Sequence, residues 1–202
     1  MQPDHNHPSP KFTAFVHRLG ALVAAQTDDV QLRVDASALL RDLVAVDDWL
    51  APEHALPDST RYRQNLLHLD AEKRFSVVAF VWGPGQQTAI HDHTVWGLIG
   101  MLRGAETSQG YRFTGPSKMV KAGQPTLLQP GQVEAVGPRI GDIHHVRNAY
   151  DDRVSVSIHV YGGDIGAVER NIYSEDGTPQ AYISGYSEPL ERTAAHTEEA
   201  AS

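Results

Sequence analysis

The chain has 202 residues, 41% hydrophobic and 21% charged, which is an ordinary composition for a single globular domain. Its formal net charge is −8 and it contains no basic run, which argues against a nucleic-acid partner and against anionic membrane surfaces. Cysteine is absent, so disulfides, thiolate metal ligands and a cysteine nucleophile are excluded, and any metal must be bound by nitrogen and oxygen donors.

No stretch reaches the roughly 18 apolar residues that a membrane span needs. The opening residues are polar and carry no apolar secretion signal. We therefore expect a cytoplasmic protein without a membrane partner.

The first part of the chain is predicted to be helical. Residues 1–10 hold three prolines among polar residues and are expected to form a disordered tail. Apolar residues then follow a helical period from Phe12 to Val23, and again from about Asp28 to Leu50. We expect residues 11–58 to form helices that pack on the rest of the molecule.

After Arg61 the pattern changes to short strands separated by glycine and proline turns. The run 75–82 is almost continuously apolar, as expected for a strand covered on both faces. Further strands are predicted at 88–93, 96–103, 105–113, 126–129, 132–136, 142–148 and 153–161. Many short strands of this kind predict a mainly β sandwich or barrel over residues 59–185. A flexible tail is expected at 186–202.

Two histidine pairs lie in predicted strands about fifty residues apart. His91 and His93 are two residues apart, so on a strand both would project from the same face. Two imidazoles placed in this way can hold a metal ion if a third donor comes from elsewhere, and His144 is the candidate. Three neutral nitrogen ligands with open coordination positions are typical of a catalytic centre. His145 would face away from His144 on a regular strand and is left out of the ligand set.

The glycines around these histidines resemble the two motifs of the cupin family. Gly85, His91-Asp92-His93, Gly97 and Gly104 follow the first motif, and Gly141-Asp142-Ile143-His144 with Asn148 follows the second. Cupins are double-sheet barrels of jelly-roll type. The resemblance therefore implies a cupin double-stranded β-helix with an N-terminal helical segment, which agrees with the independent strand count.

Gly97 stands where many cupins carry a glutamate as a fourth ligand. Without that carboxylate, the 2+ charge of a metal is not compensated by the protein, so the site should favour an anionic substrate ligand such as a thiolate. Glu106 lies well past this position and is not expected to replace it. A three-histidine site without this glutamate resembles the metal site of the thiol dioxygenases, the cupin branch that includes cysteine dioxygenase. The resemblance implies Fe(II) bound by His91, His93 and His144, with a small thiol carboxylate and O2 as substrates.

The predicted strand at 153–161 carries a second constellation. Its residues alternate cleanly, so Ser157, His159 and Tyr161 share one face. The Ser-x-His-x-Tyr pattern resembles the hydrogen-bonded relay beside the iron of thiol dioxygenases. It implies a tyrosine hydroxyl that donates to oxygen or orients a substrate, with His159 and Ser157 orienting that hydroxyl.

Three positions resemble the bacterial glutamine-type 3-mercaptopropionate dioxygenases rather than the animal cysteine dioxygenases. Gln64 replaces an arginine that pairs with the substrate carboxylate, Gly97 replaces a cysteine cross-linked to the tyrosine, and Gly162-Gly163 replaces Ser-Pro. In the bacterial group an arginine after the relay strand takes the carboxylate, and Arg170 is the candidate here. The resemblance favours oxidation of 3-mercaptopropionate to 3-sulfinopropionate, with L-cysteine to cysteine sulfinate as the alternative.

Two other functions stay open at this point. Three histidines also suit zinc, so a zinc cupin with hydrolytic or isomerising activity is a second hypothesis. A non-catalytic sensor of small ligands is a third, although no basic patch or DNA-binding segment accompanies the predicted barrel. The preferred thiol and the formation of a homo-oligomer are also left open.

Overall fold

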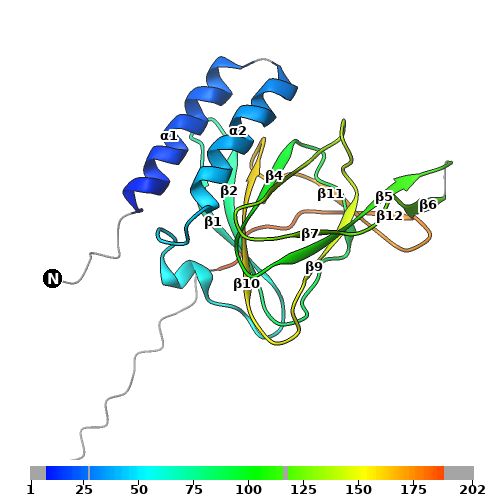
Figure 1. The fold of residues 1–202 in the computed structure, drawn as a ribbon. Coiled ribbons are helices and arrows are strands. Elements are labelled where there is room, and N and C mark those ends of the chain that lie inside the picture. The colour runs from blue at the N-terminus through cyan, green and yellow to red at the C-terminus, as the bar shows by residue number, and fades with distance from the viewer. Residues whose placement is uncertain (1–7, 27, 116–117, 189–202) are drawn as a thin grey trace, which may run out of the picture.

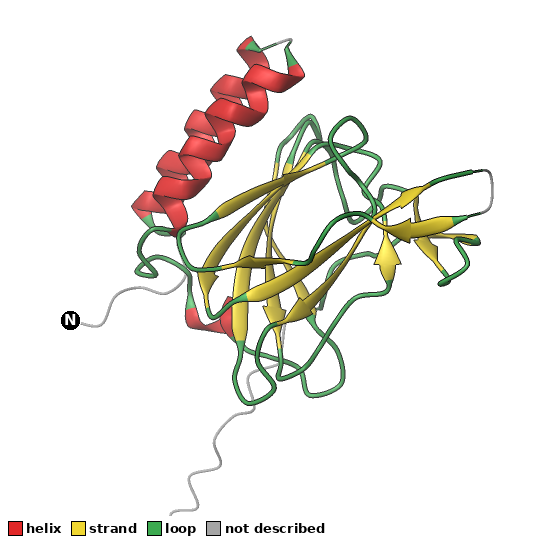
Figure 2. Cartoon of the chain, turned by 45° about the vertical axis from the view of Figure 1, so that its right-hand side comes forward, coloured by secondary structure: helices red, strands yellow, loops and turns green. Residues whose placement is uncertain are grey.

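The computed structural model of the chain describes residues 8–26, 28–115 and 118–188. Two antiparallel sheets face each other, and a hairpin of two helices lies against the outer face of one of them (Figure 1). The predicted mainly β, double-stranded β-helix fold with an N-terminal helical segment is confirmed (Figure 2). Among the described residues, no helix combines the length and the apolar character needed to cross a membrane.

The helices are α1 (Pro10–Ala25) and α2 (Asp29–Val44). Ser9 caps α1 by accepting a hydrogen bond from the Phe12 N–H, and Pro10 has the fixed φ that suits a first helical turn. The helix thus begins at Pro10, one residue before the boundary predicted after residue 10. Residues 1–7 of the predicted tail lie outside the described residues.

Helix α2 is shorter than the predicted 28–50. After Val44 the chain folds back, and the Trp49 indole N–H donates to the Leu43 carbonyl at 3.0 Å. The Trp49 ring also stacks on Phe12 with ring centroids 5.2 Å apart. Because this contact satisfies a carbonyl of the last turn, it ends the helix where periodicity alone predicted continuation. A short 3-10 helix, η1 (Pro52–Ala55), follows.

The strands form two sheets whose pairings are all antiparallel. The first has the order β1 (Arg63–Leu69), β2 (Ser76–Trp82), β10 (Ser155–Tyr161), β4 (Gly97–Arg103) and β8 (Val133–Val136). The second has the order β12 (Pro179–Tyr182), β11 (Arg170–Tyr173), β3 (Ile90–His91), β9 (His144–Asn148), β5 (Glu106–Phe113) and β6 (Met119–Lys121), with β7 (Thr126–Leu128) beside β5. Strands β1, β6, β11 and β12 were not predicted.

The five-stranded sheet separates two interiors. Its outer face packs against the helices, and Gly100 of β4 lets α2 approach closely: a Cβ at this glycine would lie 2.9 Å from the Leu40 side chain and 3.1 Å from Val44. Its inner face looks toward the second sheet and carries Phe80, Trp82 and other residues of a separate cluster. The polar residues described next also lie in the space between the two sheets.

The first residues of the predicted tail at 186–202, residues 186–188, pack against the rest of the molecule. The Tyr186 hydroxyl donates to Asp164 at 2.7 Å and accepts from the Gly166 N–H at 3.1 Å. The Ser187 N–H donates to the Gln64 carbonyl, and the Ser187 hydroxyl accepts from the Gln64 N–H. Residues 189–202 of that prediction lie outside the described part of the chain.

Candidate metal centre and relay

Three histidines converge between the sheets. His91 ends β3, His93 follows in the next loop, and His144 begins β9 directly opposite His91. One ring nitrogen of each lies within 4.8 Å of the other two, and the ring centroids are 4.7 to 5.0 Å apart. The structure thus brings together the three ligands expected from the sequence, while His145 on the same strand is left out of the group.

His93 reaches this cluster by a different route from the predicted one. Strand β3 covers only Ile90–His91, so it is shorter than the expected strand over 88–93 and does not include His93. Asp142 holds the loop instead: Oδ1 accepts from the His93 N–H at 3.2 Å and lies 3.1 Å from ring Nδ1, and Oδ2 accepts from the Thr94 N–H at 3.0 Å. Thr94 has a φ of 60°, which a β-branched residue rarely adopts. This strained turn, and not a regular strand, directs the His93 imidazole toward the cluster.

The Nδ1 atom of each imidazole is engaged by a neighbouring polar group, so the same ring atom is occupied in all three. These contacts are His91 Nδ1 with the Ala89 carbonyl at 3.0 Å, His93 Nδ1 with Asp142 at 3.1 Å, and His144 Nδ1 with the Ser108 hydroxyl at 3.1 Å. Partners of this kind fix the tautomer and leave Nε2 as the metal-binding atom. His93 Nε2 is buried and has no hydrogen-bond partner among the described residues. A donor set of three imidazole nitrogens fits a divalent transition metal.

Burial keeps the rings of His91 and His144 in the neutral form that binds a metal. His91, His93 and His144 are 9%, 0% and 5% exposed. Loss of solvation, with a smaller contribution from His93, lowers the pKa of His91 to about 3. Burial also lowers the pKa of His144 well below its ordinary value. Protons therefore compete little with a metal for these two imidazoles near pH 7.

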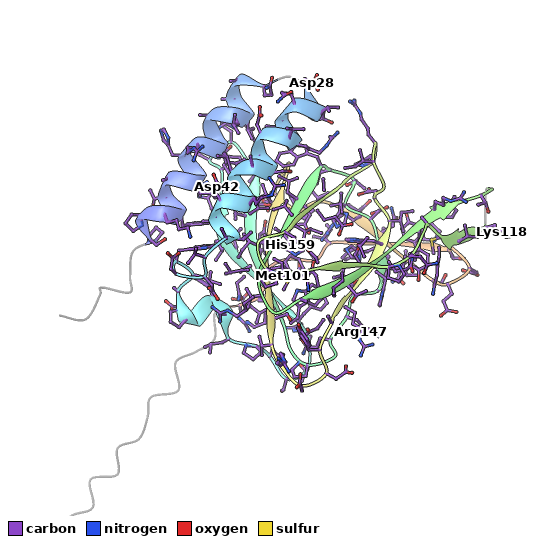
Figure 3. All side chains as sticks on the ribbon, viewed as in Figure 1. Asp28, Asp42, Met101, Lys118, Arg147 and His159 are labelled. Atoms are coloured by element: carbon purple, nitrogen blue, oxygen red, sulfur yellow. The ribbon has the colours of Figure 1, made fainter. Side chains whose placement is uncertain are left out.

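Ser157, His159 and Tyr161 form a continuous line of hydrogen bonds on the inner face of β10. Ser157 Oγ lies 2.9 Å from His159 Nε2, and His159 Nδ1 lies 2.8 Å from the Tyr161 hydroxyl. The Tyr161 ring stacks against His93 with centroids 5.5 Å apart, so the line ends at the metal-binding cluster. Figure 3 shows His159 in the middle of the molecule, whereas Lys118 lies at its periphery.

The aromatic surroundings hold this line in place and set its charge. Phe80 stacks on His159 with centroids 3.9 Å apart, and the Trp82 indole N–H donates to Ser157 Oγ at 3.1 Å. Burial raises the pKa of the Tyr161 phenol well above its ordinary value and lowers the pKa of His159 well below its own. Near pH 7 the phenol is therefore protonated and the imidazole neutral.

Gly97 lies beside the end of this line. It pairs directly with Tyr161 across β4 and β10. A Cβ at Gly97 would lie 3.0 Å from two ring carbons of Tyr161 and 2.9 Å from Val136. Any side chain here would press on the tyrosine ring.

Comparison with known proteins agrees with this geometry. The sequence profile of the family "Cysteine dioxygenase type I" matches residues 6–173. The chain belongs to the cysteine dioxygenase type I family. Cysteine dioxygenase type 1 of Danio rerio is 27% identical over 118 residues, which cover 56% of each chain. The Homo sapiens protein of the same name is 31% identical over 107 residues, which cover 52% of each chain.

The chain spans about half the length of these curated relatives of the cysteine dioxygenase family. A solved structure from Klebsiella pneumoniae, described as an uncharacterized conserved protein with a double-stranded β-helix domain, aligns with a TM-score of 0.44 and 16% identity. That alignment covers 65% of this chain and 86% of the other.

Arg170, which we expect to bind the substrate carboxylate, begins β11. Because Ile172 pairs with His91, Arg170 projects from the same face of the sheet as that histidine. Arg170 is 4% exposed, lies 4.9 Å above the Tyr182 ring and donates from Nη2 to Ser184 at 2.6 Å. Its Nε is buried without a partner among the described residues. The structure therefore places a positive group with an unused donor on the face that carries the ligands.

Gln64, the other residue expected to bind substrate, lies on β1. It pairs with Phe80, which in turn pairs with Ser157, so all three face the inner side of the sheet. Its hydrogen bonds run from the backbone to Ser187, and none joins its side chain to the relay within the described residues. Gln64 is thus on the correct face but two strands away from the relay.

Three neighbours of the cluster and the relay were not predicted from the sequence: Asp142, Ser108 and Trp82. Glu106 was considered only as a metal ligand. Asp142 stands two residues before His144 within the second motif, and this spacing would have placed it near the cluster. Ser108 gives no such signal, because its contact with His144 depends on the pairing of β5 with β9. Trp82 and Glu106 are distant from Ser157 in the sequence and come near it only through the fold. As expected, Glu106 is no member of the group that could hold a metal.

Proposed function

We propose that this protein is an iron(II)-dependent thiol dioxygenase, which adds both atoms of O2 to the sulfur of a small thiol carboxylic acid to give a sulfinate. The observation that carries the proposal is the convergence of three imidazoles beside the buried Ser-His-Tyr line. Membership of the cysteine dioxygenase type I family supports it.

His91, His93 and His144 would hold the metal through their Nε2 atoms. Iron(II), when bound, would supply a common point of attachment for a thiolate and O2 and remove the spin barrier to their reaction. The group contains three imidazoles and no carboxylate among the described residues. The chain therefore leaves the 2+ charge available to an anionic substrate sulfur.

The residues around the cluster bind and orient the substrate. The buried Tyr161 phenol is protonated near pH 7, so it can donate a hydrogen bond to a group held beside His93. His159 and Ser157 fix the position of that hydroxyl. The guanidinium of Arg170 would bind the substrate carboxylate, because its unused Nε–H and buried charge suit an anion.

The favoured substrate is 3-mercaptopropionate, with L-cysteine as the alternative. L-cysteine carries an ammonium group that would need a carboxylate partner. The two aspartates next to the ligands are already engaged: Asp142 with His93 and Thr94, and Asp92 with Asn171 and Tyr173. A substrate without an ammonium group fits this arrangement better. A cysteine-free chain also suits a reducing cytoplasm, where we propose that the protein works.

The test is to load the purified protein with Fe(II) under anaerobic conditions and to add O2 with each thiol. We expect O2 uptake and sulfinate formation, with a higher kcat/KM for 3-mercaptopropionate than for L-cysteine. Protein loaded with Zn(II) should consume no O2. If the iron-loaded protein consumes neither thiol, the proposal fails.

The carboxylate role is tested separately. Arg170→Gln should raise the KM for 3-mercaptopropionate by about 100-fold, because a buried ionic contact is lost, while iron content is unchanged. Gln64→Ala should have a smaller effect. The matched control is Arg147→Gln, at an exposed arginine paired with Asp151 (Figure 3). An unchanged KM in the Arg170 variant would remove this residue from the substrate site.

A further inference from the structure

We propose that Glu106 sets the direction of the hydrogen bonds along Ser157, His159 and Tyr161, and so decides whether the tyrosine hydroxyl donates into the metal site or back to His159. Glu106 would act as a positioning residue at the far end of the line. Its consequence for catalysis rests on the proposed function, but the hydrogen-bond switch itself does not.

Glu106 is a buried carboxylic acid. It begins β5, is 1% exposed, and its Oε2 has no hydrogen-bond partner among the described residues. Ser157 and Trp82 lie close enough to its carboxyl group to stabilise the charged form. No salt bridge joins it to a basic residue in the described part of the chain. A carboxyl group buried in this way changes protonation more readily than it tolerates a permanent charge.

Glu106 is the member of this line whose pKa lies near neutrality. Burial raises the pKa of Glu106 to about 7, and the charge of Glu134 on β8 contributes to the rise. The neighbouring polar groups of Ser157 and Trp82 oppose the rise. The fully buried groups His159 and Tyr161 on β10 and His144 on β9 have pKa values displaced far from neutrality. His145 and Arg147 also lie on β9, and burial lowers the pKa of His145.

When Glu106 is protonated, every donor along the line can be paired with an acceptor. The Trp82 indole N–H donates to Ser157 Oγ. The Glu106 O–H can donate to the second lone pair of that oxygen, and the Ser157 O–H then donates to His159 Nε2. His159 Nδ1–H in turn donates to the Tyr161 oxygen. The phenol O–H is left to donate into the metal site.

When Glu106 is ionised, every donor along the line can again be paired with an acceptor. Each hydrogen bond between Glu106 and Tyr161 then runs in the opposite direction. The Ser157 O–H now donates to the carboxylate, and Ser157 Oγ accepts from Trp82 and from His159 Nε2–H. His159 Nδ1 accepts from the Tyr161 O–H, so the phenol oxygen presents only lone pairs to the site. The two states differ by one proton. A shift of one proton across each bond passes a proton from Glu106 to a basic atom bound beside Tyr161, without leaving a charge on the three residues between them.

The predicted signature is a change of tautomer at His159. In protein labelled with ¹⁵N-histidine and loaded with Zn(II), nitrogen shifts distinguish Nδ1–H from Nε2–H, and His159→Gln identifies the signal. As pH rises from about 5 to about 9, across the range where histidine and such buried acids titrate, His159 should change from Nδ1–H to Nε2–H. Glu106→Gln, which keeps the shape of the side chain but cannot ionise, should hold one tautomer throughout.

Glu134→Gln is the matched control. It removes the neighbouring charge that raises the pKa of Glu106, so the change of tautomer should persist with a lower midpoint. A constant His159 tautomer in the unmodified protein, or a change that persists in Glu106→Gln, overturns the proposal. The enzymatic assay is independent: a tautomer switch in a protein that oxidises no thiol would refute only the proposed function, whereas thiol oxidation with a constant tautomer would refute only the switch.

Discussion

The two faces of strand β10 are equally buried and chemically opposite. The residues that face the helices are Val156, Ile158 and Val160, each 0% exposed. The residues that face the second sheet are Ser157, His159 and Tyr161, between 0% and 3% exposed. Burial therefore does not distinguish the structural face from the face that carries the proposed relay.

What distinguishes the two faces is the satisfaction of polar atoms. An apolar face needs only close packing, whereas every buried donor and acceptor on the inner side needs a partner in a defined direction. In the described residues, three buried side-chain atoms have none: His93 Nε2, Glu106 Oε2 and Arg170 Nε. They belong to the proposed metal site, the far end of the relay and the proposed carboxylate site. The unsatisfied atoms thus mark the parts of the molecule that await a ligand or a proton.

The largest effect is expected from removal of a proposed metal ligand. His144→Ala should weaken Fe(II) binding by more than about 100-fold, since the loss of a direct ligand should exceed the 10- to 100-fold cost of losing a residue that only supports one. His145→Ala on the same strand is the matched control, because His145 does not join the cluster. Metal titration of both variants measures the difference. Equal affinities in the two variants would refute the three-histidine site.

The outer face should respond to substitution in stability rather than in chemistry. Ile158→Ala deletes fully buried methyl groups beneath the helices, so the free energy of unfolding should fall by about 2–5 kcal/mol. Iron content of the folded fraction should not change. Urea denaturation measures the effect, and a loss below about 1 kcal/mol would contradict close packing on this face. Ser157→Ala, one residue away, should instead leave buried partners at Trp82 and His159 unsatisfied.

The sequence predicted the β10 faces well because a period of two depends only on strand geometry. His91 and His144 were likewise predicted from two motifs that both fall on strands. His93 lies in the cluster as well, but Asp142 rather than a continued strand directs its side chain there. Helix α2 ended early through a contact of Trp49 that periodicity does not encode.

Strands β11 and β12 could not be predicted from their own residues. They are short, partly polar segments, and β11 owes its position to pairing with β3. The contact of Glu106 with Ser157 was hidden for the same reason, because it depends on two strands of different sheets. Long-range pairing therefore determined what the sequence alone did not.

A smaller effect is expected on the pH dependence of stability. The carboxyl of Glu106 has an ordinary pKa of 4.5 and a pKa of about 7 when folded, so between these values the folded state binds the extra proton. The free energy of unfolding should therefore fall as pH rises through this window and then level off, by on the order of 3 kcal/mol.

Glu106→Gln should abolish this decline, which urea denaturation at several pH values would measure as the difference between variant and unmodified protein. Glu175→Gln, at an exposed glutamate, is the control and should keep the decline. The same slope in the Glu106 variant would mean that another group is responsible.

The smallest change in stability is expected for Tyr161→Phe. The variant keeps the ring against His93 and removes only the hydroxyl, so His159 Nδ1 loses one hydrogen bond and the free energy of unfolding should fall by about 1 kcal/mol. Iron binding should persist, because no ligand is touched. Turnover should nevertheless fall by about 100-fold if the phenol assists proton transfer or orientation at the metal. Iron content, O2 uptake and sulfinate yield measured on one preparation separate these effects, and full turnover without the hydroxyl would reduce the inner face of β10 to a structural role.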